Sequence, residues 1–155
     1  MHDVTLLQLF NDDIATAQQL LQLIDGEFKA LTARDLPALE GILGAKQPLL
    51  ALLHQHGGER HKLLNALNLS PDRLGLQALA STSPQGEELL ASGDRLGELL
   101  AQCQTANLRN GRLIRANQAS IGSVLGILRG GETPGLYDSR GGAARIAQQR
   151  PLSQA

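Results

Sequence analysis

Three histidines close together in the sequence come nearest to the chemistry of a metal site. Ligands that one helix supplies to a single metal ion are spaced three or four residues apart. His54 and His61 share a helix face, but they are seven residues apart, which is about 10 Å along a helix axis. His56 points to another side of the same helix. The pattern therefore predicts solvated surface histidines and no metal site.

Cys103 is the single cysteine, so no intramolecular disulfide can form. It falls among the apolar positions of a long helical pattern, where a buried and inert thiol is expected. A catalytic thiol needs a base beside it, and the sequence signals no such partner. The phosphate-binding glycine motifs are absent from the sequence as well. We expect no catalytic residue, no cofactor and no enzymatic activity.

The late part of the chain is rich in arginine, although the whole chain carries a net charge of -1. From Arg109 onward there are seven arginines and only two acidic residues, Glu132 and Asp138. This end of the chain would favour an acidic surface. Arg109, Arg112 and Arg115 lack interleaved aromatic residues, so they predict a solvated helical face and no nucleic-acid binding.

Leucine dominates the composition of the elements that must position these residues. The chain has 32 leucines, against nine isoleucines and valines together. Leucine favours helices, whereas β-branched residues favour strands. Three aromatic residues, Phe10, Phe28 and Tyr137, are too few for a core of stacked rings. The composition therefore predicts an all-α protein.

Apolar residues at alternating steps of three and four indicate where the helices lie. They predict three long helices, over residues 3–31, 36–67 and 84–129, and a short helix over residues 71–80. These helices would form one elongated antiparallel three-helix bundle with coiled-coil-like packing over residues 1–129. Residues 130–155 hold no apolar period and predict a flexible C-terminal tail.

The second long helix carries the clearest stripe and the clearest interruptions. Asp35 is its expected N-cap, and Pro48 and Gly57-Gly58 predict a kink or a local break. Its expected packing stripe consists of Leu36, Leu39, Leu43, Lys46, Leu50, Leu53, Gly57, Arg60, Leu64 and Leu67. No apolar run approaches the ~20 residues that span a bilayer, and no signal peptide is recognised. We expect a soluble cytoplasmic protein without membrane insertion.

The last long helix is too long for its partners. At 1.5 Å per residue it is roughly 69 Å long, whereas the first two are roughly 43 and 48 Å long. Its surplus, about residues 116–129, still carries apolar residues in helical spacing, namely Ile121, Val124, Leu125 and Leu128. Such a stripe is expected to bind another chain. Alternatively, the helix breaks near Gly122 or Gly126 and folds back on its own bundle.

Three asparagines on the stripe of this helix belong to a longer pattern. Buried asparagines would fix register or partner choice, and exposed ones would mark a splayed bundle. The pattern is Asn107-x-x-Asn110-Gly111-x-x-Ile114-x-x-Asn117, then Leu128-x-Gly130, then Leu136-Tyr137-Asp138-x-x-Gly141. This arrangement resembles the C-terminal signature of the FlgN family of flagellar type III export chaperones. The Ala33-Arg34-Asp35-Leu36 turn and Lys46 are similar to that family too, so the resemblance covers essentially the whole chain.

The resemblance implies a role in building the bacterial flagellum. Proteins of this family bind hook-associated proteins of the hook–filament junction through their helical terminal segments. They prevent premature assembly in the cytoplasm and deliver this cargo to the type III export apparatus. The implied cargo-binding residues are Ile114, Asn117, Ile121, Val124, Leu125 and Leu128.

Two further expectations follow from the resemblance. Tyr137 and Asp138 would contact a component of the export gate, and the protein would be a monomer or a weak homodimer. The residues alone leave open a self-associating structural bundle without a cargo.

Overall fold

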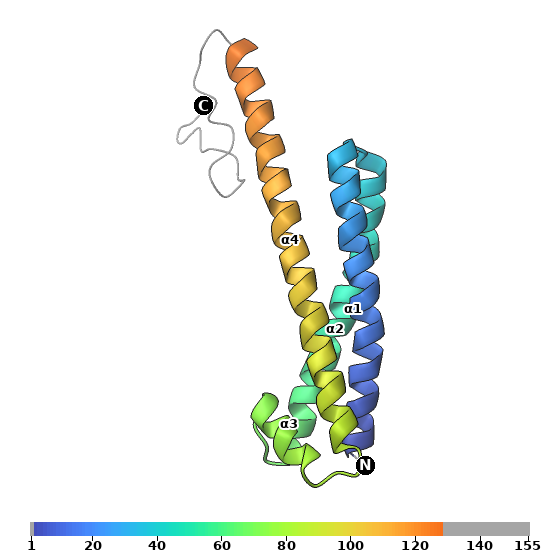
Figure 1. Ribbon diagram of the computed structural model, residues 1–155. Helices are drawn as coiled ribbons and strands as arrows, with labels where there is room; N and C mark the ends of the chain where they lie inside the picture. Colours follow the sequence, from blue (N-terminus) through green and yellow to red (C-terminus); the bar gives the residue numbers. More distant parts are fainter. Residues whose placement is uncertain (1, 129–155) are drawn as a thin grey trace. The chain divides into compact units, whose positions relative to one another are not determined.

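Four helices make up the regular structure of the part of the chain that is described here. The computed structural model describes residues 2–128 of the 155 residues, and along residues 117–128 it describes the helix without its side chains. The helices are α1 (His2–Ala33), α2 (Leu36–Ala66), α3 (Arg73–Ala80) and α4 (Gly86–Leu128) (Figure 1). Each begins and ends within two residues of the range that the apolar spacing predicts. Within the described residues, the protein is all-helical, and the expected tail, 130–155, lies outside them.

The chain divides into two compact units, and each is described by itself. The first unit, Met1–Leu108, contains α1, α2, α3 and the beginning of α4. The second unit, Arg109–Ala155, begins inside α4, and its described part is the remainder of that helix. Of the two outcomes predicted for α2 at Pro48 and Gly57-Gly58, the local break does not occur, because α2 continues through these residues as one α-helix, and the kink stays a prediction.

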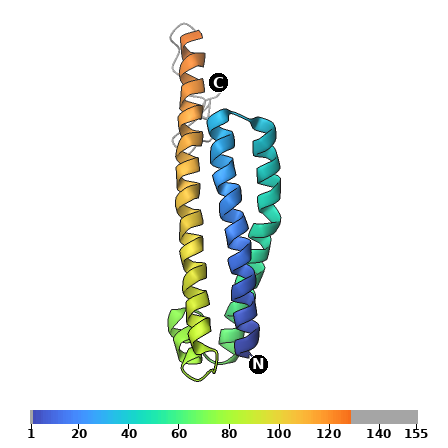
Figure 2. The same ribbon diagram turned by 45° about the vertical axis from the view of Figure 1, so that its right-hand side comes forward.

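All four helices contribute side chains to the core of the first unit, in which α1 and α2 lie side by side (Figure 2). The main cluster consists of Leu6, Phe10 and Ala17 from α1, Leu64 from α2, Leu76 from α3, and Leu89, Leu96 and Leu99 from α4. A second cluster joins Leu20 and Ile24 of α1 to Cys103 and Ala106 of α4. The short α3 is therefore a structural part of this unit, because its Leu76 is only 6% exposed.

The turn between α1 and α2 forms as its residues predict. Arg34 adopts the left-handed conformation with φ 56°, and this reverses the chain directly after α1. Asp35 then caps α2, since its carboxylate accepts a hydrogen bond from the backbone N–H of Ala38 at 3.2 Å. The backbone N–H of Asp35 donates to the carbonyl of Ala30 at 2.9 Å. The two long helices are thus joined by a tight connection that backbone and side-chain hydrogen bonds hold in place.

Buried acidic residues of α1 meet basic residues of α2. The side chain of Asp13 is fully buried; it pairs with Arg60, and its Oδ1 lies 2.7 Å from Nδ1 of His56. Further along α1, the buried Glu27 pairs with Lys46 at 3.4 Å. Asp13, the earlier of the two acids, pairs with Arg60, the later of the two bases, whereas Glu27 pairs with the earlier Lys46. The two helices therefore run antiparallel. These contacts fix both the alignment of the two helices and the face of α2 that points toward α1.

The packing stripe predicted for α2 is right at seven of its ten positions, which are buried or half-buried, and wrong at three. Leu36, Leu43 and Leu50 are 68%, 43% and 42% exposed, although they were expected to pack against the bundle. Along the same stretch the predicted Leu39, Lys46 and Leu53 are half-buried, and so are Ile42 and Leu49, which the prediction left out. Because Lys46 and Arg60 must reach the acids of α1, α2 is rotated so that one of its two leucine stripes faces outward.

Removing the carboxylate of Asp13 tests whether this ion cluster holds α1 against α2. The change Asp13→Ala leaves Arg60 and His56 without their shared partner, so we expect a loss of about 3 kcal/mol in the free energy of unfolding. Urea unfolding followed by circular dichroism measures it. The matched control is Asp12→Ala, because Asp12 is an exposed neighbour whose carboxylate accepts a hydrogen bond from Gln8 of its own helix at 2.9 Å. A control change as large as that of Asp13→Ala would contradict the assignment.

Candidate functional site

The segment of α4 that belongs to the second unit is the candidate binding element. It continues as α-helix from Arg109 to Leu128, so residues three and four positions apart share one face of it. The predicted binding residues Ile114, Asn117, Ile121, Val124, Leu125 and Leu128 all lie in this helix. Ile114 is 38% exposed. The side chains of the other five lie outside the described residues.

The two described asparagines of the pattern differ in their surroundings. Asn110 is 2% exposed, and its Oδ1 accepts a hydrogen bond from Nε of Arg109 at 3.1 Å. Asn107, which precedes it by one helical turn, is exposed. Of the three arginines predicted to form a solvated face, Arg112 and Arg115 are exposed, whereas Arg109 is half-buried. The asparagine stripe therefore combines a buried amide with an exposed one, while Asn117 has no described side chain.

The predicted gate-contact residues, Tyr137 and Asp138, lie outside the described residues. The structure therefore contributes nothing to their assignment, and it remains a prediction from the sequence.

The side chains that look most reactive do not form a chemical site. Among residues whose side chains are described, no group of three or more His, Cys, Asp or Glu could hold a metal ion. His54 and His61 are exposed as expected, but His56 is half-buried against Asp13, so the prediction that all three are surface histidines is wrong for His56. Its partner could not be foreseen, because the two residues are far apart in sequence.

Cys103 is buried, as its position on the helical stripe predicts. It is 4% exposed, and its Sγ lies 3.7 Å from the carbonyl oxygen of Ala17. Burial raises the pKa of the thiol above its ordinary value, and the negative charge of Asp25 adds to the effect. A thiol with a raised pKa is a poor nucleophile near neutral pH.

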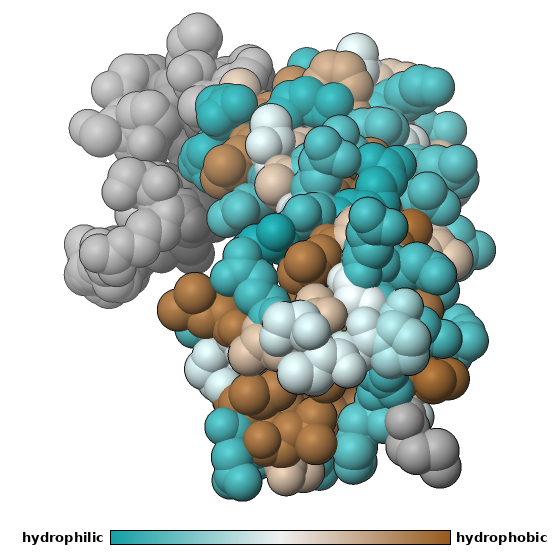
Figure 3. Space-filling model, turned by 60° about the horizontal axis from the view of Figure 1, so that its bottom comes forward, coloured by the Kyte–Doolittle hydropathy of each residue, from teal (hydrophilic) through white to brown (hydrophobic). Residues whose placement is uncertain are grey.

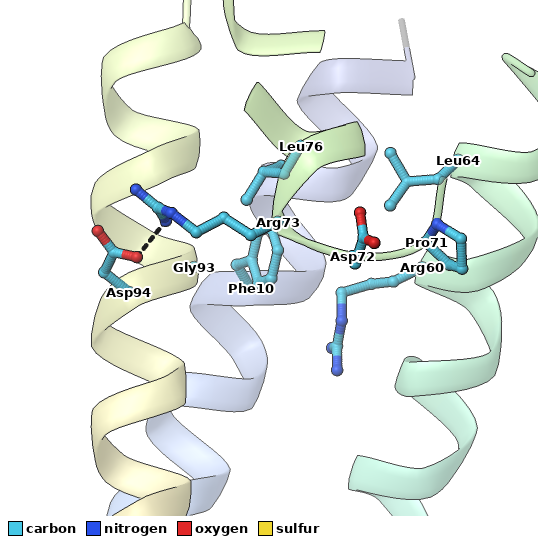
Figure 4. Close-up of a pocket in the computed structure, with 9 residues that line it drawn as sticks. All are labelled: Phe10, Arg60, Leu64, Pro71, Asp72, Arg73, Leu76, Gly93 and Asp94. Atoms are coloured by element: carbon cyan, nitrogen blue, oxygen red, sulfur yellow. Dashed lines mark hydrogen bonds and ion pairs between the residues drawn. The ribbon is translucent and has the colours of Figure 1, made fainter. Parts of the chain in front are cut away.

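A pocket of about 240 Å³ lies in the first unit beside α3 (Figure 4). Its lining consists of Phe10, Arg60, Leu64, Pro71, Asp72, Arg73, Leu76, Gly93 and Asp94. Arg60 lies over the ring of Phe10 at 5.4 Å, and Arg73 forms an ion pair with Asp94. The volume is below the roughly 300 Å³ at which small-molecule sites begin, and the lining offers no nucleophile with a base. The size and lining of the pocket therefore suit a single apolar side chain of another protein better than a small-molecule substrate.

The loop that borders this pocket is held by Asp72. Asp72 accepts hydrogen bonds from the hydroxyl of Ser70 at 2.6 Å and from the backbone N–H of Gly75 at 3.2 Å. The Ser70 bond first, and the Gly75 bond second, hold the pKa of this carboxyl below its usual value. Nearby, Leu74 is 70% exposed, and Figure 3 shows apolar surface broken by polar surface at this end of the first unit.

Comparison with known proteins decides which family this architecture represents. The model of the FlgN protein family matches residues 1–145. The chain belongs to the FlgN family. A crystal structure from Pseudomonas aeruginosa, of a protein described as a putative flagella synthesis protein FlgN, is similar with 57% sequence identity and a TM-score of 0.69. The match covers 81% of this chain and 96% of that one.

Membership of the FlgN family confirms the resemblance seen in the sequence. Together with the solved FlgN structure, it supports a role in the flagellum for this chain. Sequence reasoning missed two features of this FlgN-family chain, the buried Asp13 cluster and the outward leucines of α2. The spacing of apolar residues could indicate neither feature. The Asp13 cluster consists of polar residues, and the exposure of the α2 leucines depends on which of two apolar stripes packs against α1.

The burial of Cys103 makes its chemistry testable. We expect the thiol to react with Ellman's reagent about tenfold or more slowly than an exposed cysteine at pH 8, because it reacts only when the core opens. The reference is the variant that carries Gln18→Cys with Cys103→Ser, since Gln18 is exposed on α1. Equal rates would show that Cys103 is accessible.

The raised pKa of Cys103 also has a consequence for stability. The folded state favours the neutral thiol. The contribution of this thiol to the free energy of unfolding is therefore fully present below the ordinary pKa of 9.0 and is lost as the pH rises above that value. The free energy of unfolding should therefore fall between pH 8 and pH 10 by more than it does in Cys103→Ser.

Proposed function

We propose that this FlgN-family chain is a flagellar export chaperone that works in the cytoplasm. Its cargo is the helical terminal segments of the hook-associated proteins of the hook–filament junction. It keeps this cargo from assembling early and delivers it to the type III export apparatus. The observation that carries the proposal is the continuity of α4, which remains helical through Leu128 and so keeps Ile114, Ile121, Val124 and Leu128 on one face.

The length of α4 supports this role. It has 43 residues, whereas α1 has 32 and α2 has 31. An apolar stripe on such a helix can cover the matching stripe of a cargo helix, in the manner of an amphipathic helix in a groove. Each side chain that becomes buried contributes about 1.5–3 kcal/mol. Ordering a segment on binding costs about 2–5 kcal/mol, and the resulting moderate affinity suits a chaperone that must release its cargo.

The finer architecture is part of the same proposal. We infer that α1, α2 and α4 form an antiparallel bundle with coiled-coil-like packing, to which α3 is added. The antiparallel register of Asp13 with Arg60 and of Glu27 with Lys46 supports this arrangement for α1 and α2. The bundle would then provide a rigid base for the binding part of α4.

Charge substitutions on the binding face of α4 test the cargo role. The double variant Val124→Asp with Leu128→Asp places two charges on the apolar stripe, so we expect it to abolish binding to a hook-associated protein in a pull-down after co-expression. We expect its thermal midpoint to stay within about 2 °C of the wild type, which corresponds to at most about 1 kcal/mol.

The matched control is the double variant Ala119→Asp with Ser123→Asp. It adds the same charge to the same part of α4, on the opposite face by helical spacing. It should retain binding. A large fall in the midpoint of the first variant would mean that Val124 and Leu128 belong to the core of the protein, and the cargo surface would have to lie elsewhere.

The proposed delivery step depends on a residue outside the binding face. Tyr137→Ala should leave cargo binding intact and reduce secretion of the junction proteins into the medium, because Tyr137 is proposed to contact the export gate together with Asp138. Tyr137→Phe is the conservative comparison, since it keeps the ring and removes the hydroxyl. A loss of cargo affinity in Tyr137→Ala would contradict this division between binding and delivery.

A further inference from the structure

One face of α2 is exposed along most of the helix, although it is rich in leucine. This outer face of α2 consists of Leu36, Glu40, Leu43, Gly44, Gln47, Leu50, Ala51, His54 and Gly58, all of which are exposed. Their spacing places them on one side of the helix. Lys46, His56 and Arg60 point instead toward the acids of α1, so the same contacts that attach α2 to α1 leave this face unoccupied within the first unit.

The outer face of α2 is unusually apolar for a surface that meets water. An 18-residue stretch of α2 has a mean hydropathy of 1.2, and none of its residues is fully buried. Leu36, Leu43 and Leu50 recur every seven residues on it and are each more than two-fifths exposed. A repeated row of exposed leucines on one helix indicates a surface that another helix covers.

The outer face of α2 is complementary to a second, antiparallel copy of itself that is centred on Gln47. Residues at equal distances on the two sides of Gln47 pair a large side chain with a small one. The pairs are Leu36 with Gly58, Leu43 with Ala51, and Leu50 with Gly44. Two antiparallel copies of the face would therefore place each leucine against a residue that leaves room for it. An added Cβ at Gly44 or Gly58 meets nothing within 4 Å, so both positions are open to receive a leucine.

The ionisable residues of the outer face of α2 are also placed symmetrically about Gln47. Its two ionisable residues are Glu40 and His54, and each is seven positions from Gln47. In an antiparallel pair of faces, Glu40 of one copy lies opposite His54 of the other, and no two like charges meet. Gln47 lies on the two-fold axis, where two amides can hydrogen-bond to each other.

We propose that the outer face of α2 binds the same face of a second copy of this chain. The two α2 helices run antiparallel, with the two-fold axis at Gln47, which is the isologous contact of a symmetric dimer. The proposal goes beyond the chaperone role and does not depend on it, because it uses none of the residues assigned to cargo or export gate.

The charge pattern favours a second copy over a lipid surface. Helices that lie on membranes carry Lys and Arg along their polar face, which attract anionic lipids. On the opposite side of α2, Lys46 and Arg60 are paired with acids of α1, so they are not available to attract anionic lipids, and the outer face itself has the polar Gln47 at its centre. By length and composition alone α2 could cross a membrane, so a lipid-binding measurement belongs among the tests.

Filling the two open positions should abolish the dimer without harming the fold. We expect the full chain to show a concentration-dependent monomer–dimer equilibrium in sedimentation equilibrium. The variant Gly44→Leu with Gly58→Leu should weaken the dimer at least tenfold, because the partner's leucines lose their space, and its helix content and thermal midpoint should not fall.

The matched control is Gly41→Leu. Gly41 lies in the same helix and also has nothing within 4 Å of an added Cβ, but it is about a third of a turn away from Gln47. It should dimerise like the wild type. A wild-type chain that stays monomeric at 1 mM, or a control weakened as much as the double variant, would overturn the proposal.

Cross-linking tests the position of the axis. In a Cys103→Ser background, Gln47→Cys should form a disulfide between two copies when copper–phenanthroline is added as oxidant, because each new thiol meets its own counterpart. Gln18→Cys, on an exposed position of α1, should not form it at the same rate. Equal rates for the two positions would overturn the two-fold axis at Gln47. Flotation of the wild type with phosphatidylglycerol vesicles that becomes stronger in Gly44→Leu with Gly58→Leu, which adds apolar surface to the face, would assign the face to lipid and overturn the dimer.

Discussion

A fully buried carboxylate on α1 is the constraint on which the arrangement of the first unit depends. The side chain of Asp13 has no exposed surface, and an unpaired charge in such a place is strongly unfavourable. It is balanced by Arg60 and His56, which both come from α2. Because Arg60 also lies over the ring of Phe10, the cluster joins the charged contact to the apolar core. The rotation of α2 about its own axis follows from these contacts.

We infer that the ion pairs between α1 and α2 restrict the register in which the two helices pack. Buried pairs gain little over well-packed apolar side chains, but they tolerate no other alignment. Two leucine-rich helices could slide past each other by one heptad with little loss of apolar contact. With Asp13 held by Arg60 and Glu27 held by Lys46, such a shift would separate both acids from their partners. The polar contacts therefore select one register from several that leucine alone would allow.

The bounds of the helices were predictable from the sequence, whereas the packed face of α2 was predictable only in part. The bounds follow from apolar spacing and from local signals such as Asp35, whose capping depends on residues three positions away. The buried Asp13 depends on Arg60, which is distant in sequence, so no local pattern could indicate it. On α2, the stripe through Leu36 and Leu43 was as regular as the one through Leu49. Only the charged partners on α1 distinguish the stripe that packs from the stripe that stays exposed.

The candidate binding residues were predictable in a different way. The long α4 follows from apolar spacing alone, but the roles of Val124, Leu128 and Tyr137 come from the resemblance to the FlgN family. Family membership is now shown by the match over residues 1–145, whereas these individual roles stay predictions. A role in binding cannot be derived from spacing, because an apolar stripe has the same pattern whether it packs within its own chain or against a partner.

The two proposed surfaces belong to different units of the chain, and this makes their functions separable. The outer face of α2 lies in the first unit, and the proposed cargo residues lie in the second. The first surface is argued from exposed, described side chains, and the second from the continuity of a helix. A dimer through α2 would bring two cargo-binding helices into one particle without using either of them. Each dimer could then bind two cargo molecules independently, so the stoichiometry of the complex would report on both surfaces at once.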